Sequence, residues 1–309
     1  MVMNLEEKLF NYLSLFWLRP ENGLLTTFKS RVFEDLELAQ PSIDISCADG
    51  LFMFLHLGGE FEFEFDIFRS TKASQFRHDK FVDIFDHYDS SYQVPVKKRP
   101  SCKISVGTDW KQDLLKKAQP LDLYDKLVLH DNNQLPLPFE DDSFQTAYSN
   151  SLYWVKNVQP LLGEVRRILV PGGRAILEMK TPSLLKTLDE LEKYLSPEAV
   201  ALLNRQRRET MPGSFEVARW KEMIKELGFR IEDIRPVYPS KVLIDIWNVG
   251  LRPVAHLLVQ MTDSLPGEQR SRIKKEWVDI FYTLAKPLLN IAPDYSLEDA
   301  PYVCFVLKK

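Results

Sequence analysis

The sequence predicts an α/β protein whose doubly wound, mostly parallel sheet has seven strands, and three observations predict it. Short apolar runs alternate with amphipathic helical patterns along most of the 309 residues. Acidic or amide side chains directly follow several of these runs. The last apolar run, 302–308, comes after a long helical stretch at the C-terminus. Strands that alternate with helices indicate βαβ units with right-handed crossovers.

The composition is that of a globular chain that can bury a full core, with 45% hydrophobic residues. A net charge of −4 disfavours general binding to nucleic acid. Three cysteines without a CxxC pattern indicate a reducing compartment and no disulfide framework. Two glutamates precede the first apolar run, so the N-terminus is a poor signal peptide, and no run is long enough to span a membrane. We therefore expect a cytoplasmic protein.

The periodicity places each element along the chain. Residues 4–37 predict two helices, which Pro20 and Gly23 separate. Strands are predicted at 42–46, 102–109, 125–131, 143–150, 174–180, 229–237 and 302–308. Helices are predicted at 110–118, 158–169, 183–195, 197–209 and 217–228, and mostly helical patterns at 240–262 and 267–290. Pro171-Gly172-Gly173 predicts a turn between one helix and the strand that begins at 174.

Four pieces of the stretch 125–178 carry a family resemblance. They are Asp131 after an apolar strand, LPLPFEDDSF at 135–144, GEVRRIL at 163–169 and VPGGRAILE at 170–178. In this order they resemble the second half of a class I S-adenosylmethionine-dependent methyltransferase domain, of the kind called methyltransferase type 11. The resemblance implies a Rossmann-like methyltransferase fold with S-adenosylmethionine as the cofactor. It also implies that the final strand is antiparallel and lies between the fifth and sixth strands.

Three segments outside this core are expected to determine specificity within a single domain of residues 1–309. They are an N-terminal helical cover at 1–40, an insertion after the first strand at 51–101, and a helical insertion before the last strand at 239–298. Covers of this extent favour a small or medium-sized acceptor, or a lipid or glycan intermediate. The oligomeric state stays open.

The first strand and its turn resemble the first cofactor motif of the family, an acidic residue followed by glycines at alternate positions. Here the motif runs from Asp44 through Cys47 to Gly50, with Ser46 and Ala48 where the family usually has glycine. Glycine allows a tight turn and a close approach of the backbone to the ligand. Because serine and alanine are the smallest substitutes, we expect a working but altered pocket. Ligands of doubly wound sheets bind beyond the carboxyl ends of the strands.

The second motif is an acidic residue that ends strand two and accepts hydrogen bonds from the ribose hydroxyls. Asp109 and Asp66 are the two candidates. We favour Asp109, followed by Trp110, because it ends SVGTD and its distance from Asp131 suits one helix and one strand. A carboxylate is suited to the role because it accepts only and can engage two donors.

The ends of strands three and four supply the remaining candidates. Asp131 resembles the acceptor for the adenine amino group, and Asn132 adds a neighbouring amide; an Asx-turn is the structural alternative. Asn150 would lie under the sulfonium. Tyr153 and Trp154 are candidates for the methyl-acceptor pocket, with packing against the following helix as the alternative.

The chemistry implied is an in-line displacement, in which the protein mainly positions the acceptor. A general base is needed only for an acceptor that is protonated at working pH. No catalytic residue and no metal site are assigned, and His56, His78, His87 and His130 are weak candidate bases. Two alternatives stay open: an inactive methyltransferase-like scaffold, suggested by Ser46 and Ala48, and an RNA or protein methyltransferase.

Overall fold

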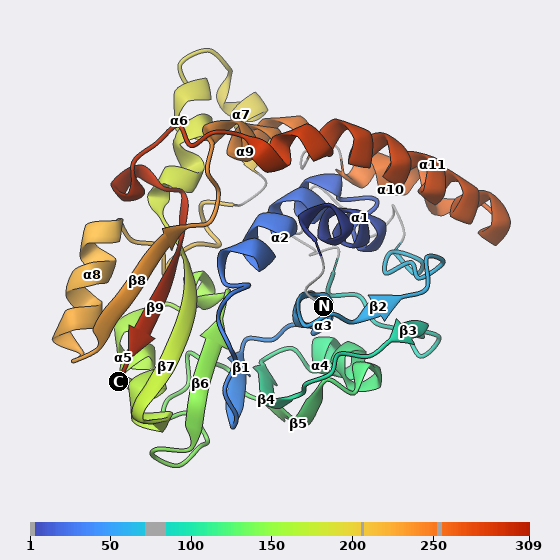
Figure 1. Ribbon diagram of the computed structural model, residues 1–309. Helices are drawn as coiled ribbons and strands as arrows, with labels where there is room; N and C mark the ends of the chain where they lie inside the picture. Colours follow the sequence, from blue (N-terminus) through green and yellow to red (C-terminus); the bar gives the residue numbers. More distant parts are fainter. Residues whose placement is uncertain (1–3, 72–84, 205–206, 252–254) are drawn as a thin grey trace.

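A computed structural model describes residues 4–71, 85–204, 207–251 and 255–309. Within these residues, seven strands form one sheet in the order β5-β4-β1-β6-β7-β9-β8 (Figure 1). The first five strands of this order are parallel to one another, whereas β9 is antiparallel to both β7 and β8. The strands are β1 (Ser42–Ile45), β4 (Ile104–Asp109), β5 (Tyr124–Leu129), β6 (Phe144–Ser149), β7 (Leu169–Lys180), β8 (Arg230–Pro236) and β9 (Tyr302–Lys308). The predicted fold class and the place of the last strand are confirmed.

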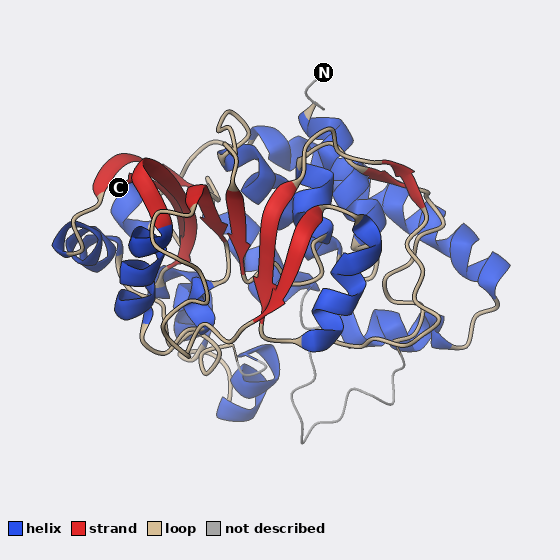
Figure 2. Ribbon diagram, turned by 90° about the horizontal axis from the view of Figure 1, so that it is seen from below, coloured by secondary structure: helices blue, strands red, loops and turns tan. Residues whose placement is uncertain are grey.

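Helices cover both faces of the sheet (Figure 2). They are α1 (Leu5–Leu15), α2 (Pro20–Val32), α3 (Leu51–His56), α4 (Gln112–Ala118), α5 (Val158–Ile168), α6 (Lys186–Leu191), α7 (Pro197–Asn204), α8 (Val217–Glu226), α9 (Lys241–Asp245), α10 (Ala255–Asp263) and α11 (Gly267–Ala285), with a π-helical stretch at Ile246–Leu251. No helix among the described residues is long and apolar enough to cross a membrane.

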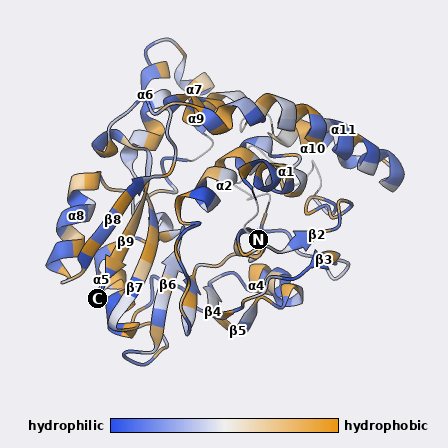
Figure 3. Cartoon of the chain, in the orientation of Figure 1, coloured by the Kyte–Doolittle hydropathy of each residue, from blue (hydrophilic) through white to orange (hydrophobic). Residues whose placement is uncertain are grey.

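Alternation along the strands divides the core into two hydrophobic clusters. Tyr148 and Ile176 face the cluster that α1, α2 and α3 complete. Their neighbours Ala147 and Leu177 face the opposite cluster, which α5 and α8 complete. Successive side chains of a strand point to opposite faces, so both faces of β6 and β7 need apolar residues. The hydrophobic colouring of β7 and β9 in Figure 3 agrees with strands that are buried on both faces.

Two local details differ from the sequence-based expectation. Gly23 lies inside α2 and does not end a helix. A Cβ at this position would lie 3.0 Å from the Cα of Leu13 on α1. The glycine therefore lets α1 and α2 approach closely, and Pro20 starts α2 at the position proline favours. The predicted turn at 171–173 lies within β7, where an irregularity in the pairing with β6 and a φ of 78° at Gly172 accommodate it.

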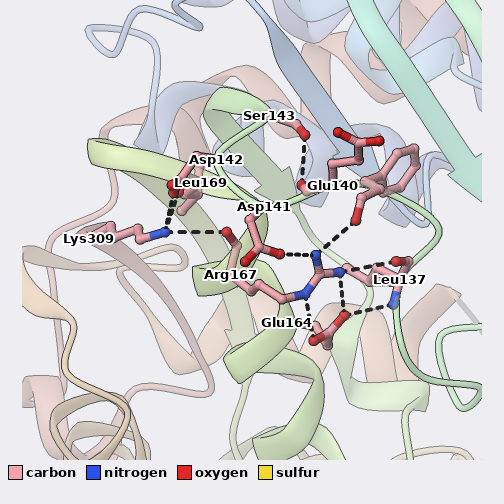
Figure 4. Close-up of polar contacts among 10 residues, drawn as sticks. Leu137, Glu140, Asp141, Asp142, Ser143, Glu164, Arg167, Leu169 and Lys309 are labelled. Carbon is pink, nitrogen blue, oxygen red and sulfur yellow. Dashed lines mark hydrogen bonds and ion pairs between the residues drawn. The ribbon is translucent and has the colours of Figure 1, made fainter.

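Arg167 of α5 contacts the motif segment 137–143 at several points (Figure 4). Its guanidinium donates to the backbone carbonyls of Leu137 and Phe139 at 3.1 and 2.9 Å. The same group pairs with Glu164 and Asp141, each at 2.7 Å. Since arginine presents several donors in a fixed planar geometry, one residue can order the whole loop. This network explains why the motif segments 135–144 and 163–169 occur together.

The segments outside the core lie on the side of the sheet where the parallel strands end. Helices α1 and α2 contact α11, and the π-helical stretch contacts α2. Figure 1 shows α9, α10 and α11 passing above α1 and α2. The described part of 51–101 contains α3 and a small sheet of β2 (Glu60–Phe61) and β3 (Val96–Lys98).

Candidate active site

A pocket of about 500 Å³ lies beyond the carboxyl ends of the parallel strands. Residues that follow β1, β4, β5 and β6 form one side of it, and residues of α2 and the π-helical stretch form the other. Nine of the predicted site residues line it: Ser46, Ala48, Asp109, Trp110, Asp131, Asn132, Asn150, Tyr153 and Trp154. Parallel strands end at the same edge of a sheet, which brings these distant positions together.

The loop after β1 has the backbone conformation that glycine favours. Ser46, Ala48 and Gly50 have φ values of 63°, 52° and 72°, all in the left-handed region. A residue with a Cβ adopts this region at a cost of about 1–2 kcal/mol. Ser46 and Ala48 therefore adopt the left-handed conformation that glycine usually provides. Each also adds a small side chain that lines the pocket.

Asp109 at the end of β4 links this loop to the next strand. Its Oδ2 accepts from the backbone N–H of Ala48 at 3.0 Å, and its Oδ1 accepts from that of Lys111 at 2.9 Å. Burial raises the pKa of Asp109, and the two backbone hydrogen bonds oppose that rise. Because a carboxylate oxygen has two lone pairs, both oxygens can each accept one further hydrogen bond from a ligand.

Asp66, the alternative to Asp109, is engaged in a different part of the molecule. It forms an ion pair of 2.5 Å with Arg270 on α11, and both side chains are buried. It also accepts from the indole N–H of Trp17 at 2.8 Å and from the backbone N–H of Phe68 at 3.0 Å. Asp66 therefore joins the segments outside the core to one another and does not line the pocket.

Asn132 lines the pocket and carries a buried acceptor. Its Nδ2 donates to the hydroxyl of Ser46 at 2.8 Å, while its buried Oδ1 has no hydrogen-bond partner among the described residues. An orphaned acceptor of this kind fits a ligand with an N–H donor. Neighbouring Asp131 forms the Asx-turn that the sequence allowed, with the backbone N–H of Asn133 at 2.9 Å, and it also lines the pocket.

Three predicted cofactor residues do not line the pocket. Asp44 lies beneath the loop, where it accepts a 2.7 Å hydrogen bond from Tyr124 and burial raises its pKa to about 7. Cys47 is buried as well, and a Cβ at Gly50 would lie 2.9 Å from the Tyr124 ring. These residues shape the loop from below. Asp49, which the sequence analysis did not select, lines the pocket instead, and burial raises its pKa.

The other end of the pocket is aromatic. The ammonium of Lys180 lies 3.1 Å from the centre of the Tyr153 ring. The hydroxyl of Tyr302 donates to the backbone carbonyl of Asn150 at 2.8 Å, and its ring stacks on Tyr238 at 5.6 Å. Sequence reasoning missed Lys180 and Tyr302, although a signal existed. Lys180 ends β7 and Tyr302 begins the antiparallel β9, so both lie at the edge of the sheet that binds ligands.

No histidine of the described residues lines this pocket. His56 hydrogen-bonds to Ser30 at 2.9 Å, and burial lowers its pKa to about 3. His87 lies 3.8 Å from Asp89 outside the pocket, and His130 does not line the pocket either. His78 falls outside the described residues. Nor do the described residues contain a group of three or more side chains suited to a metal ion.

Comparison with known protein families finds a match for the central part of the chain. Residues 92–177 match the methyltransferase domain family. This segment holds β4, β5, β6, α5 and most of β7, whereas β1 and its loop precede it. No curated protein matches the chain.

Solved structures with a similar arrangement include three methyltransferases or candidate methyltransferases. One is an S-adenosylmethionine-dependent methyltransferase of Mesorhizobium loti, with 15% identity, a TM-score of 0.43 and coverage of 87% of this chain and 90% of that one. A second, described as a possible histamine N-methyltransferase of Thermotoga maritima, has 14% identity, a TM-score of 0.47 and coverage of 93% and 92%. A third, from Haloferax volcanii in complex with the Trm112 methyltransferase activator, has 13% identity, a TM-score of 0.45 and coverage of 95% and 94%.

At TM-scores below 0.5 these likenesses carry no weight for the substrate. The assignment rests on the matched segment and on a strand order in which antiparallel β9 lies between β7 and β8. The pocket beyond the strand ends offers a buried carboxylate and an unpartnered amide acceptor, which fit an adenosine. Residues 92–177 thus carry a methyltransferase domain, and the pocket at the ends of its strands fits S-adenosylmethionine.

Proposed function

We propose that the protein methylates an O, N or C atom of a small or medium-sized acceptor by in-line displacement. The observation that carries the proposal is the single pocket, in which one end has the cofactor motifs and the other has Tyr153, Tyr238 and Tyr302. Residues of α2 and the π-helical stretch line this same pocket, so donor and acceptor would lie between the sheet and a helical cover. Such an enclosure suits a molecule that can enter it whole.

The residues of this chain would hold the cofactor in the following way. Asp109 would accept from the ribose hydroxyls with the lone pairs that Ala48 and Lys111 leave available. Asn132 and Asp131 would accept from the adenine amino group, and exposed Trp110 would cover the base. Asp49 has the charge to pair with the methionine ammonium. When bound, S-adenosylmethionine supplies a methyl group that is already activated on a sulfonium.

The remaining task of the protein is to position the acceptor and exclude water. Asn150 follows β6 at the centre of the strand edge, and Tyr302 fixes its backbone carbonyl at 2.8 Å. Tyr153 and Tyr238 present aromatic surface that can hold the acceptor near this point. Orientation of two reactants accounts for much of the barrier reduction in such transfers. An acceptor that is deprotonated at working pH needs no base.

Calorimetric titration with S-adenosylmethionine, followed by transfer of a radiolabelled methyl group, tests the proposal. The label should enter the low-molecular-weight fraction of a cell extract and not its RNA or protein. Failure of the wild-type protein to bind the cofactor at high micromolar concentration would disprove the proposal. Label in RNA or protein would instead indicate that the acceptor is a macromolecule and not a small molecule.

A further inference from the structure

One face of α2 lines the pocket from the side opposite the strand ends. Its residues are Asn22, Leu25, Thr26 and Lys29, at the spacing of side chains on a single helix face. Of these four, only Lys29 carries an ionisable group. The nitrogen of its amine lies 5.0 Å from the centre of the Tyr302 ring. This face of α2 therefore brings an amine to the aromatic end of the pocket.

Lys29 lies close to the place at which the methyl group would be transferred. The hydroxyl of Tyr302 donates to the backbone carbonyl of Asn150, which directly follows β6. The Tyr302 side chain thus contacts both the amine of Lys29 and Asn150. Within the described residues, the amine of Lys29 forms no hydrogen bond and no ion pair. It is therefore available to a ligand in the pocket.

A buried carboxylate acts on Lys29 without contacting it directly. Glu178 of β7 is fully buried, and its Oε1 accepts from Tyr148 at 3.2 Å, whereas its Oε2 has no hydrogen-bond partner among the described residues. Glu178 and Lys29 attract each other. Both this carboxylate and the face of the Tyr302 ring would stabilise the ammonium that forms when Lys29 takes up a proton.

The interior position of Lys29 favours its uncharged form more than water does. Burial lowers the pKa of Lys29, the attraction of Glu178 opposes this shift, and the repulsion of Arg207 adds to it. Helices α1 and α11 and the π-helical stretch also pack on α2, but over the ranges given above they place no ionisable side chain in the pocket lining. Lysines whose pKa is lowered by burial are suited to act as general bases.

Other ionisable groups at this end of the pocket are less suited to accept a proton. Burial raises the pKa of Tyr238 and that of Tyr302, so both hydroxyls stay protonated. Arginine keeps its proton in proteins, which excludes Arg207. Lys180, the second lysine of this end, lies 3.1 Å from the centre of the Tyr153 ring, and a variant of it belongs in the test.

We propose that Lys29 is the general base of the transfer and that the acceptor is a hydroxyl or an amine that carries a proton. This inference rests on the proposed function. As the lone pair of the acceptor atom forms its bond to the methyl carbon, the carbon–sulfur bond breaks and its electron pair stays on the sulfur. The proton of the acceptor passes to the lone pair of the Lys29 nitrogen, from which water later removes it. Base catalysis of this kind contributes about 100-fold or more to a rate.

A titration of the lysine amines tests the state of Lys29 without any acceptor. The protein is labelled with ¹³C at the lysine Cε atoms and saturated with S-adenosylhomocysteine, and its resonances are followed against pH. Lys29→Arg and Lys193→Arg each remove one resonance and so assign it. The Lys29 resonance should shift at a lower pH than that of Lys193, which lies at an exposed position outside the pocket.

Transfer of a radiolabelled methyl group to the low-molecular-weight fraction of a cell extract tests the role of Lys29. Near neutral pH, Lys29→Arg should be at least about 100-fold slower than wild type, because arginine keeps the positive charge but cannot accept a proton. Its affinity for S-adenosylhomocysteine should not change. The wild-type rate should level off once Lys29 has lost its proton, whereas the rate of the variant should keep rising with pH as the acceptor ionises by itself. Lys193→Arg is the matched control and should behave as wild type.

Three results would overturn the inference and leave the proposed function intact. They are a Lys29 resonance that shifts together with that of Lys193, transfer by Lys29→Arg within about tenfold of wild type, and a loss of transfer in Lys180→Arg but not in Lys29→Arg. Since the titration needs no acceptor, it decides the inference whatever the extract contains. Failure of S-adenosylhomocysteine to bind the wild-type protein is a different result, because it removes the proposed function and the inference together.

Discussion

The carboxylate of Asp109 accepts a 3.0 Å hydrogen bond from the backbone N–H of Ala48, 61 residues earlier in the chain. This bond ties the end of β4 to the loop after β1, where Ala48 has a φ of 52°. The residue proposed to hold the ribose thus also holds the loop that faces the rest of the cofactor. Loss of the carboxylate should remove a ligand contact and release the loop at the same time.

Asp109→Ala is therefore expected to abolish cofactor binding, whereas Asp66→Ala is not. Asp66 pairs with Arg270 in a buried ion pair, and removal of one partner from such a pair costs about 3–5 kcal/mol. Asp66→Ala should thus lower the melting temperature but keep the affinity of the folded fraction. Calorimetry with S-adenosylhomocysteine, below the melting temperature of each variant, measures both affinities. Retained affinity in Asp109→Ala together with lost affinity in a folded Asp66→Ala would reverse the assignment of strand two.

Ala48→Gly should stabilise the protein, contrary to the usual effect of glycine. Relief of the left-handed strain is worth about 1–2 kcal/mol, and the greater freedom of glycine in the unfolded chain offsets about 0.5–1 kcal/mol. Urea unfolding should therefore show a small net gain. Ala201→Gly, at an exposed position in α7, is the control and should lose about 1 kcal/mol. A loss at position 48 as large as that at position 201 contradicts the prediction.

Asp44 should make the protein less stable as the pH rises. Burial raises its pKa from 3.8 to about 7, so the folded protein keeps a proton that the unfolded chain releases near pH 4. Because the folded state binds more protons in this window, its free energy of unfolding falls between about pH 4 and pH 7 and levels off above. Each unit of pKa shift is worth about 1.4 kcal/mol.

Asp44→Asn should remove this part of the pH dependence, since its amide carbonyl can still accept from Tyr124. The measurement is the difference in unfolding free energy between the variant and wild type across the window. Whatever the difference at low pH, the variant should become more stable relative to wild type as the pH rises. Asp113→Asn, on the exposed side of α4, should give a flat difference. A flat difference for Asp44→Asn as well would mean that Asp44 is ionised throughout.

Arg167→Met should destabilise the protein by about 2 kcal/mol, because two partly buried carbonyls of the 137–143 loop lose charge-assisted donors. The matched variant Arg219→Met breaks a surface pair with Glu222 on α8, and such pairs contribute less than about 1 kcal/mol. Urea unfolding of both variants provides the comparison. Equal small losses would show that the loop keeps its conformation without Arg167.

The sheet and the cofactor end of the pocket follow from local sequence patterns. Strands and helices were predictable because apolar periodicity depends on neighbouring residues, and Asp109 and Asp131 are marked by their places after apolar strands. The same reasoning selected Asp44 and did not consider Asp49, although both belong to one short motif. The left-handed turn of the loop decided between them, by burying Asp44 against Tyr124 and directing Asp49 to the pocket lining.

By itself, therefore, the sequence determined the fold class and pointed to nine of the residues that line the pocket. Only the tertiary structure placed Lys29, Lys180 and Arg207 in one pocket, because they come from segments far apart along the chain. It alone also showed that Asp66 pairs with Arg270. Contacts of this kind depend on how whole helices pack on the sheet, and no local pattern records that packing.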